Sequence, residues 1–193
     1  ELQIFNGTEY TNIIGGARTL SLGNNQVGSD LTGEASDDEF GRAVAISHDG
    51  TVIAVGAPNN DGNGTDAGHV RVFEYSSGNW TQRGGDIDGE ANDDLSGCTL
   101  AMSSDGNTVA IGAHKNDGNG TEAGHVRVYE YTSGNWVQKG SDIDGEASED
   151  WFGGNVQGTI SLSADGSILA VGAYKNDGNG TDAGHVRVFE FTN

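Results

Sequence analysis

Short hydrophobic runs, alternating with polar residues and bounded by glycine-rich turns, recur along most of the chain. In the first complete set they occupy residues 42–47, 51–57, 69–75 and 80–87, and they are rich in Val, Ile, Phe and Tyr. This pattern is typical of β-strands joined in hairpins. No segment has the period of an amphipathic helix, so the pattern excludes a helical bundle or a helical solenoid. We predict an all-β fold.

The same set of runs is repeated along the chain. The string GHVRV occurs at 68–72, 124–128 and 184–188, and NDGNGT occurs at 60–65, 116–121 and 176–181. The interval from His69 to His125 is 56 residues and that from His125 to His185 is 60, with the extra residues in the stretch 151–159. Four short strands in a repeat of this length are characteristic of a β-propeller blade. We therefore predict propeller-type blades of four antiparallel strands.

The repeats divide the chain into about three blades and a partial one. We assign a partial blade to 1–29 and blades to 30–85, 86–141 and 142–193, the last without its final strand. Propellers usually have about four to eight blades, and an open array exposes strand edges and apolar faces. Two interpretations stay open: the chain is a segment of a longer repeat protein, or copies associate into a ring or a filament.

Residues 38–75, DEFGRAVAISHDGTVIAVGAPNNDGNGTDAGHVRVFEY, carry a family resemblance. They resemble an FG-GAP repeat, the blade of the integrin α-subunit N-terminal propeller, with Phe40-Gly41 as the FG and residues 56–58 as the GAP. At the first of these places the second repeat departs from the motif with Ser96-Gly97, and the third has Phe152-Gly153. The resemblance implies a propeller in an extracellular or cell-surface adhesion protein. The family's calcium loop has no counterpart here, so its ligands are not transferred.

The net charge of the chain limits the classes of partner that it can bind. The chain holds 29 Asp and Glu against 9 Lys and Arg, for a net charge of −20. Such a surface disfavours nucleic acids and anionic membranes, and it attracts divalent cations. No apolar stretch is long enough to span a bilayer. The single cysteine, Cys98, excludes an internal disulfide.

The repeated Gly/Asn/Asp loop is the first candidate calcium site, because it places oxygen-bearing side chains between glycines that let the loop curl around a hard cation. The alternative interpretation is a solvated turn. The candidate ligands are Asp61, Asn63, Thr65 and Asp66, then Asp117, Asn119, Thr121 and Glu122, and finally Asp177, Asn179, Thr181 and Asp182.

The repeated acidic run is the alternative metal site. Its carboxylates are close enough in sequence to repel one another, which a cation would relieve; a solvated acidic edge is the competing interpretation. The candidates are Asp86, Asp88 and Glu90, with Asp142, Asp144 and Glu146 one repeat later.

Glycosylation competes with the first metal site. Asn-x-Ser/Thr sequons lie at Asn6, Asn63, Asn79, Asn119 and Asn179. They permit N-glycosylation of a secreted eukaryotic protein. A glycan on Asn63 would hinder that amide from binding an ion.

Three repeated side-chain types have structural interpretations. Arg71, Arg127 and Arg187 follow the repeated His69, His125 and His185 by two residues, and so share a strand face with them. We expect the arginines to tie blades together through repeated carboxylates; a ligand channel is the minor alternative. Zinc is disfavoured because the histidines lie one blade apart.

An insertion in the third repeat supplies the candidate ligand surface. Trp151 and Phe152 stand at its start, and aromatic rings there offer a stacking platform.

The sequence lacks the common catalytic motifs, and repetition works against the single asymmetric constellation that catalysis needs. We predict a non-catalytic adhesion or recognition module that is secreted or on the cell surface, binds calcium, and meets a protein or glycan ligand. The competing class is a self-assembling filament or coat protein completed by strands of neighbouring subunits. A third is a carbohydrate-binding module.

Overall fold

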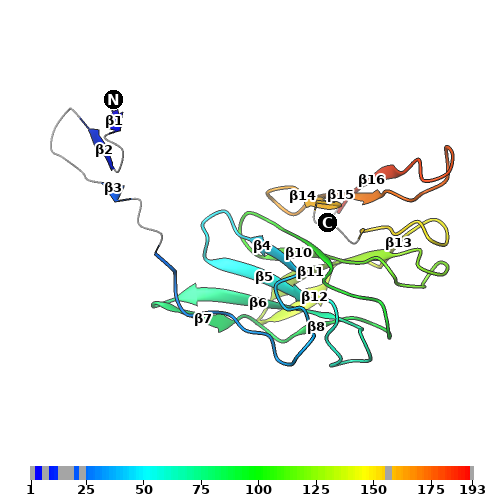
Figure 1. Ribbon diagram of the computed structural model, residues 1–193, viewed down its shortest axis with the longest axis horizontal. Helices are drawn as coiled ribbons and strands as arrows, with labels where there is room; N and C mark the ends of the chain where they lie inside the picture. Colours follow the sequence, from blue (N-terminus) through cyan, green and yellow to red (C-terminus); the bar gives the residue numbers. More distant parts are fainter. Residues whose placement is uncertain (1–2, 6–8, 13–19, 22–24, 155–157, 192–193) are drawn as a thin grey trace.

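The computed structural model describes residues 3–5, 9–12, 20–21, 25–154 and 158–191 (Figure 1). Within these ranges the secondary structure is entirely strands, bridges and turns, arranged in antiparallel sheets. The all-β prediction is confirmed. A helix long and apolar enough to cross a membrane is absent from the described part of the chain.

The first blade is a meander of neighbouring strands. Its order is β4 (Ala43–Ile46), β5 (Val52–Ala57), β6 (His69–Ser76) and β7 (Asn79–Gln82). The two-residue strand β8 (Ile87–Asp88) also pairs with β6, at His69 and Val70, whereas β7 pairs with the later residues 73–76 of β6. The predicted fourth run, 80–87, is thus split into β7 and β8, because Gly84 takes a positive φ of 82° between them.

The second blade repeats the first strand for strand. It comprises β9 (Thr99–Met102), β10 (Thr108–Ala113), β11 (His125–Thr132) and β12 (Asn135–Gln138), with β13 (Ile143–Asp144) added to β11. The third blade has β14 (Ile160–Leu162), β15 (Ile168–Ala173) and β16 (His185–Glu190). The register is conserved, since Ala57, Ala113 and Ala173 each lie opposite the histidine of the next strand.

A further antiparallel sheet precedes the blades. It consists of β1 (Gln3–Phe5), β2 (Glu9–Asn12) and β3 (Leu20–Ser21), and Figure 1 shows it apart from the three blades.

The hydrophobic core lies between blades. Val70 and Val72 of the first blade share one buried cluster with Leu100 and Ile111 of the second. Val126 and Val128 of the second blade share another with Ile160 of the third. The blade faces therefore stabilise one another, as expected when each repeat contacts its nearest neighbours.

Candidate functional site

The acidic run of each blade docks on the Gly/Asn/Asp loop of the blade before it. In the first junction the amides of Asp93, Leu95 and Ser96 donate to the carbonyls of Thr65, Asp66 and Ala67, at 2.8, 3.1 and 3.0 Å. The second junction repeats these bonds from Glu149, Trp151 and Phe152 to Thr121, Glu122 and Ala123. Gly68 is needed at this contact: its φ is +76°, and an added Cβ would collide with the Ser96 carbonyl oxygen. The two motifs predicted as metal sites thus form one latch.

Side chains of the loop already have partners within that latch. The Asp61 carboxylate accepts the Asp66 amide at 2.8 Å, and Asn63 Nδ2 donates to the Gly89 carbonyl of the next blade at 2.8 Å. The same pairs recur as Asp117 with Glu122 and Asn119 with Gly145, and Asp177 accepts from Asp182 in the third loop. The threonines Thr65, Thr121 and Thr181 and the amide Asn179 are exposed.

A buried carboxylate joins each acidic run to the loop of its own repeat. Asp94 is 3% exposed and accepts from the Ala91 amide and from Asn116 Nδ2, at 3.1 and 3.0 Å. Asp38 and Asp150 repeat this with Asn60 and Asn176. Burial raises the pKa of Asp94 above its ordinary value. These aspartates are members of the repeated acidic run, but the sequence did not predict that they are buried and bind an asparagine of their own repeat.

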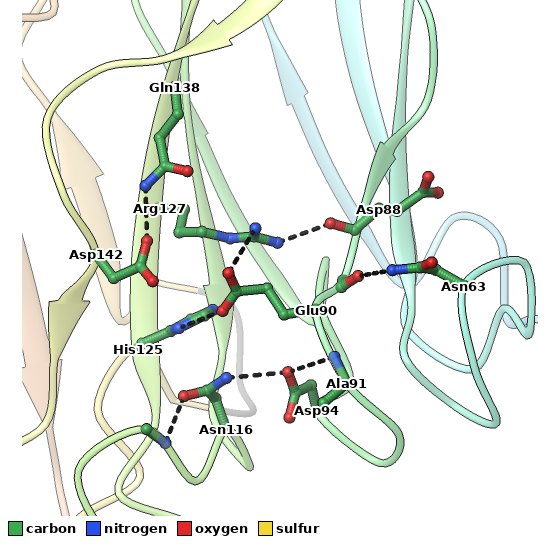
Figure 2. Close-up of polar contacts among 12 residues, drawn as sticks. Asn63, Asp88, Glu90, Ala91, Asp94, Asn116, His125, Arg127, Gln138 and Asp142 are labelled. Atoms are coloured by element: carbon green, nitrogen blue, oxygen red, sulfur yellow. Dashed lines mark hydrogen bonds and ion pairs between the residues drawn. The ribbon is translucent and has the colours of Figure 1, made fainter.

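Each complete junction also gathers a histidine between two carboxylates. The groups are Glu34, His69 and Asp86, and Glu90, His125 and Asp142, with possible ligand atoms within 4.8 Å of one another. Figure 2 shows the second group: Glu90 Oε2 lies 3.7 Å from His125 Nδ1, and Gln138 Nε2 donates to Asp142 at 2.6 Å. Each group thus combines a histidine and a carboxylate of one repeat with an aspartate of the next.

The repeated arginines pair with repeated carboxylates, as expected. Arg127 lies 3.3 Å from Glu90 and donates to the backbone carbonyl of Asp88 at 2.7 Å (Figure 2). Arg71 makes the same contacts with Glu34 and Thr32, and Arg187 with Glu146 and Asp144. Of the alternative metal candidates, Asp86, Glu90 and Asp142 lie in the histidine groups and Glu146 lies 3.7 Å from His185. Asp88 and Asp144 supply backbone carbonyls to arginines.

Burial controls the charge of the junction group. It lowers the pKa of His125 to about 4, with Arg127 adding to the effect, and it raises the pKa of Glu90. At neutral pH the imidazole is uncharged and can act as a ligand. A nitrogen donor beside carboxylates suits zinc, whereas calcium prefers oxygen ligands alone. The separation of the histidines by one blade therefore does not count against zinc, since each histidine has its own carboxylates.

A second site lies where the repeats differ. A cavity of about 240 Å³ is lined by Glu39, Arg42, Pro58, Asn59, Leu95, Cys98, His114, Lys115 and Trp151. We call it the divergent pocket. Equivalent positions hold Glu39, Leu95 and Trp151; Arg42, Cys98 and Gly154; and Pro58, His114 and Tyr174. The junction residues are repeated, whereas these positions change in every blade.

The two aromatic residues at the start of the insertion lie in different places: Trp151 lines the divergent pocket, and Phe152 lies in the core. Trp151 is half-buried; its Nε1 donates to Glu122 at 3.0 Å, and Lys175 Nζ lies 3.4 Å from its ring centroid. Phe152 is fully buried and packs edge-on against Phe189. Only Trp151 of the pair lines a cavity, because Phe152 fills the space between the second and third blades.

Cationic groups gather around this pocket. Burial lowers the pKa of His114 to about 4, and Lys115, Arg42 and Lys175 act in the same direction, against Glu122. Three of the chain's 9 Lys and Arg thus act on one imidazole, in a protein of net charge −20. Arg42 and Lys115 line the pocket against the single acid Glu39, a balance that differs from the excess of acids in the whole chain. The sequence analysis found only Trp151 here; the signal for the rest was the variation among otherwise similar repeats.

The cysteine in the pocket is not an activated nucleophile. Cys98 Sγ lies 3.3 Å from His114 Nδ1, but burial raises the pKa of the thiol and lowers that of the imidazole. Proton transfer from thiol to imidazole is therefore unfavourable, whereas catalytic cysteines have lowered pKa values.

The sequons fall into distinct settings. Asn63 and Asn119 use their Nδ2 atoms, to which a glycan would be attached, in junction hydrogen bonds. Asn79 and Asn179 are exposed, and Asn6 lies outside the described residues.

Comparison with known proteins agrees with this architecture. Residues 32–73 match the family model described as FG-GAP repeat. No curated protein matches the chain by sequence. The Pseudomonas aeruginosa periplasmic gluconolactonase PpgL is structurally similar, with a TM-score of 0.52 and 14% identity over 83% of this chain and 41% of that one. Hydrazine synthase of Kuenenia stuttgartiensis has a TM-score of 0.47 and 12% identity, over 84% of this chain and 36% of its own.

The chain spans less than half the length of either structure, and at such low identity the likeness concerns the fold alone. Residues 32–73 thus match an FG-GAP repeat, and they lie in a fold of propeller-type blades.

Proposed function

We propose that the chain is a non-catalytic recognition module of the adhesion type, displayed outside the cell, and that its divergent pocket binds an acidic sugar. One observation carries the proposal. Repeats that are alike at their junctions differ where their residues line a single cavity. The polar contacts between blades repeat, so the change in size and charge among the residues that line one cavity favours adaptation to a ligand.

The lining favours an anion with an apolar face. Arg42 lies 3.6 Å from Glu39, but 54% of its side chain is accessible. A guanidinium has donors enough to bind a ligand carboxylate through two hydrogen bonds, in exchange for this exposed ion pair. Lys115 adds a second positive charge. Pro58, Leu95 and Trp151 supply apolar surface for the face of a sugar ring. An acidic sugar combines both features.

The non-catalytic part of the proposal rests on the chemistry of the pocket. The only pair that resembles a nucleophile and base among its lining residues is Cys98 with His114. Their pKa shifts keep the thiol protonated and the imidazole neutral.

Binding of a divalent cation is a separate part of the proposal, and the histidine groups are its best-supported location. One oxygen of Glu90 faces Arg127, which leaves the other oxygen, His125 and Asp142 as donors. Carboxylates in an acidic protein favour calcium, and the imidazole favours zinc. EDTA should lower the melting temperature, because a bound ion stabilises the folded state. If zinc restores it, the effect should fall in His125→Gln and vanish when His69→Gln is added, because each histidine belongs to its own group. Restoration by calcium in the double variant would indicate oxygen ligands, and no effect of EDTA would contradict this part.

Isothermal titration with oligomers of uronic acids, and with uncharged oligosaccharides as the comparison, tests the sugar. Arg42→Ala should weaken binding about tenfold or more, the loss of roughly 1.4 kcal/mol or more, without changing the melting temperature. Lys139→Ala removes a cation outside the pocket and is the matched control. Equal binding of acidic and neutral sugars, or unchanged binding by Arg42→Ala, would contradict the proposal.

A further inference from the structure

The back face of the third blade is bare at positions that are buried in the other two. Val70 and Val72 of β6 are 0% exposed, and Val126 and Val128 of β11 are 0% and 1% exposed. Val186 and Val188, their equivalents in β16, are 68% and 66% exposed. The residues are identical, so the difference comes from the blade that covers the first two pairs.

Among the described residues, the front face of the first blade is exposed in the complementary way. The covering blade in each junction contributes the outward residues of its first strand, Leu100 with Met102 in one and Ile160 with Leu162 in the other. Ile46 of β4 is the equivalent of Met102 and Leu162, and it is 56% exposed, whereas those two are half-buried. The molecule thus carries both halves of a contact that it makes twice internally.

The backbone repeats this complementarity. Ile87–Asp88 pairs with β6 and Ile143–Asp144 pairs with β11, in both cases along the edge beside the repeated histidine. Among the described residues, the pairing of β16 is with β15 alone. Leu31 and Thr32, which are equivalent to Ile87 and Asp88, have no strand assignment. The described residues therefore hold both an open edge on β16 and a segment, Leu31–Thr32, that is equivalent to the strands pairing with that edge in the other two blades.

The ionic groups are incomplete on the same two faces. Glu146 Oε2 lies 3.7 Å from His185 Nδ1, as Glu90 does from His125. The complete groups add Asp86 or Asp142 from the following repeat. Asp30 occupies the equivalent position in the first repeat, and Gln26 orients it at 2.7 Å as Gln82 and Gln138 orient the other two.

We propose that a second copy of this chain docks head-to-tail, with its first blade covering the back of the third. Leu31–Thr32 of the second copy adds to β16 beside His185 and Val186. Its Ile46 packs over Val186 and Val188, and its Asp30 completes the group of Glu146 and His185. The contact goes beyond the proposed sugar binding, and it is heterologous, so it leads to rings or filaments rather than to a symmetric pair.

Sedimentation equilibrium of the whole chain tests this, at about 0.15 M salt so that repulsion between acidic surfaces is screened. The mass should rise with protein concentration beyond that of the monomer. Val188→Lys should weaken association about a hundredfold or more, because the contact would bury an unpaired ammonium. Ile46→Lys should have the same effect from the other face. Val137→Lys is the matched control, since Val137 is 53% exposed on β12, away from both faces.

Mixing the two variants separates head-to-tail docking from other arrangements. Val188→Lys keeps an intact front face and Ile46→Lys keeps an intact back face, so an equimolar mixture should form heterodimers but nothing larger. All of these side chains are exposed, and an unchanged circular dichroism spectrum and melting temperature verify that each variant folds. A monomeric wild-type chain at all concentrations, association lost only in Val188→Lys, or loss in Val137→Lys as well would each overturn the proposal.

Discussion

The blade junctions and the divergent pocket follow opposite rules. At the junctions the same Arg, His, Asn and Asp recur in each repeat and make the same contacts, for example Arg71 to Thr32 and Arg127 to Asp88. In the pocket the equivalent positions hold an acid, an aliphatic and an aromatic residue, as with Glu39, Leu95 and Trp151. A polar junction residue contacts the same neighbour in every repeat, so the same residue type can stand at that position in each repeat. A pocket residue meets unlike neighbours, so each can be adapted separately.

The largest expected effect concerns an aromatic side chain in a junction. Phe152→Ala should lower the free energy of unfolding by about 3–5 kcal/mol, because it leaves a cavity between two blades where Phe152 is fully buried. Phe40→Ala is the matched control at the equivalent position. Phe40 is half-buried, so its loss should be clearly smaller. Urea unfolding measures both, and equal losses would show that blade 3 does not depend on this contact.

Next come the junction arginines. Arg127→Ala should cost about 2–3 kcal/mol, because its charged hydrogen bond to Asp88 is buried, and 8% of its side chain is exposed. Arg187→Ala removes the same bond to Asp144 where 30% of the side chain is exposed. Its cost should be lower, since solvent screens the interaction. Chemical denaturation of the two variants gives the comparison, and a larger loss at Arg187 would contradict it.

An intermediate effect on stability is expected from pH, through one histidine in a blade junction and one in the divergent pocket. Folding lowers the pKa of His125 in the junction and of His114 in the pocket from 6.5 to about 4. The unfolded chain then binds these protons more readily, so the stabilisation is full above about pH 6.5 and is lost as the pH falls toward 4. The raised pKa values of Glu90 and Asp94 act in the opposite direction. Each kcal/mol lost should lower the melting temperature by roughly 2–4 °C. His125→Gln should flatten this dependence; an unchanged slope would contradict the assignment.

The smallest expected effect concerns how fully each sequon carries a glycan. In a eukaryotic secretory host, Asn79 and Asn179 should be modified more fully than Asn63 and Asn119, whose amides are engaged in junction bonds. Mass spectrometry of glycopeptides measures the occupancy. Full occupancy at Asn63 would mean that modification precedes docking of the acidic run.

The fold was predictable because its signals are local and repeated. Alternation of apolar residues, glycine turns and the three copies of GHVRV specify strands and their register without distant contacts. The pairing of Arg71, Arg127 and Arg187 with repeated carboxylates was also predictable, since each arginine shares a strand face with a repeated histidine in an acidic chain.

What only the tertiary structure decided is which repeated groups meet. The sequence marked the loop at Asp61 and the acidic run at Asp86 as separate cation sites, but the folded chain joins loop and run into one latch and brings Asp86 to His69 and Glu34. It likewise buries Phe152 while its neighbour Trp151 lines a cavity with Arg42 and His114. Local propensity acts within one blade, whereas these contacts depend on how neighbouring blades stack, and that is set by packing across residues far apart in the chain.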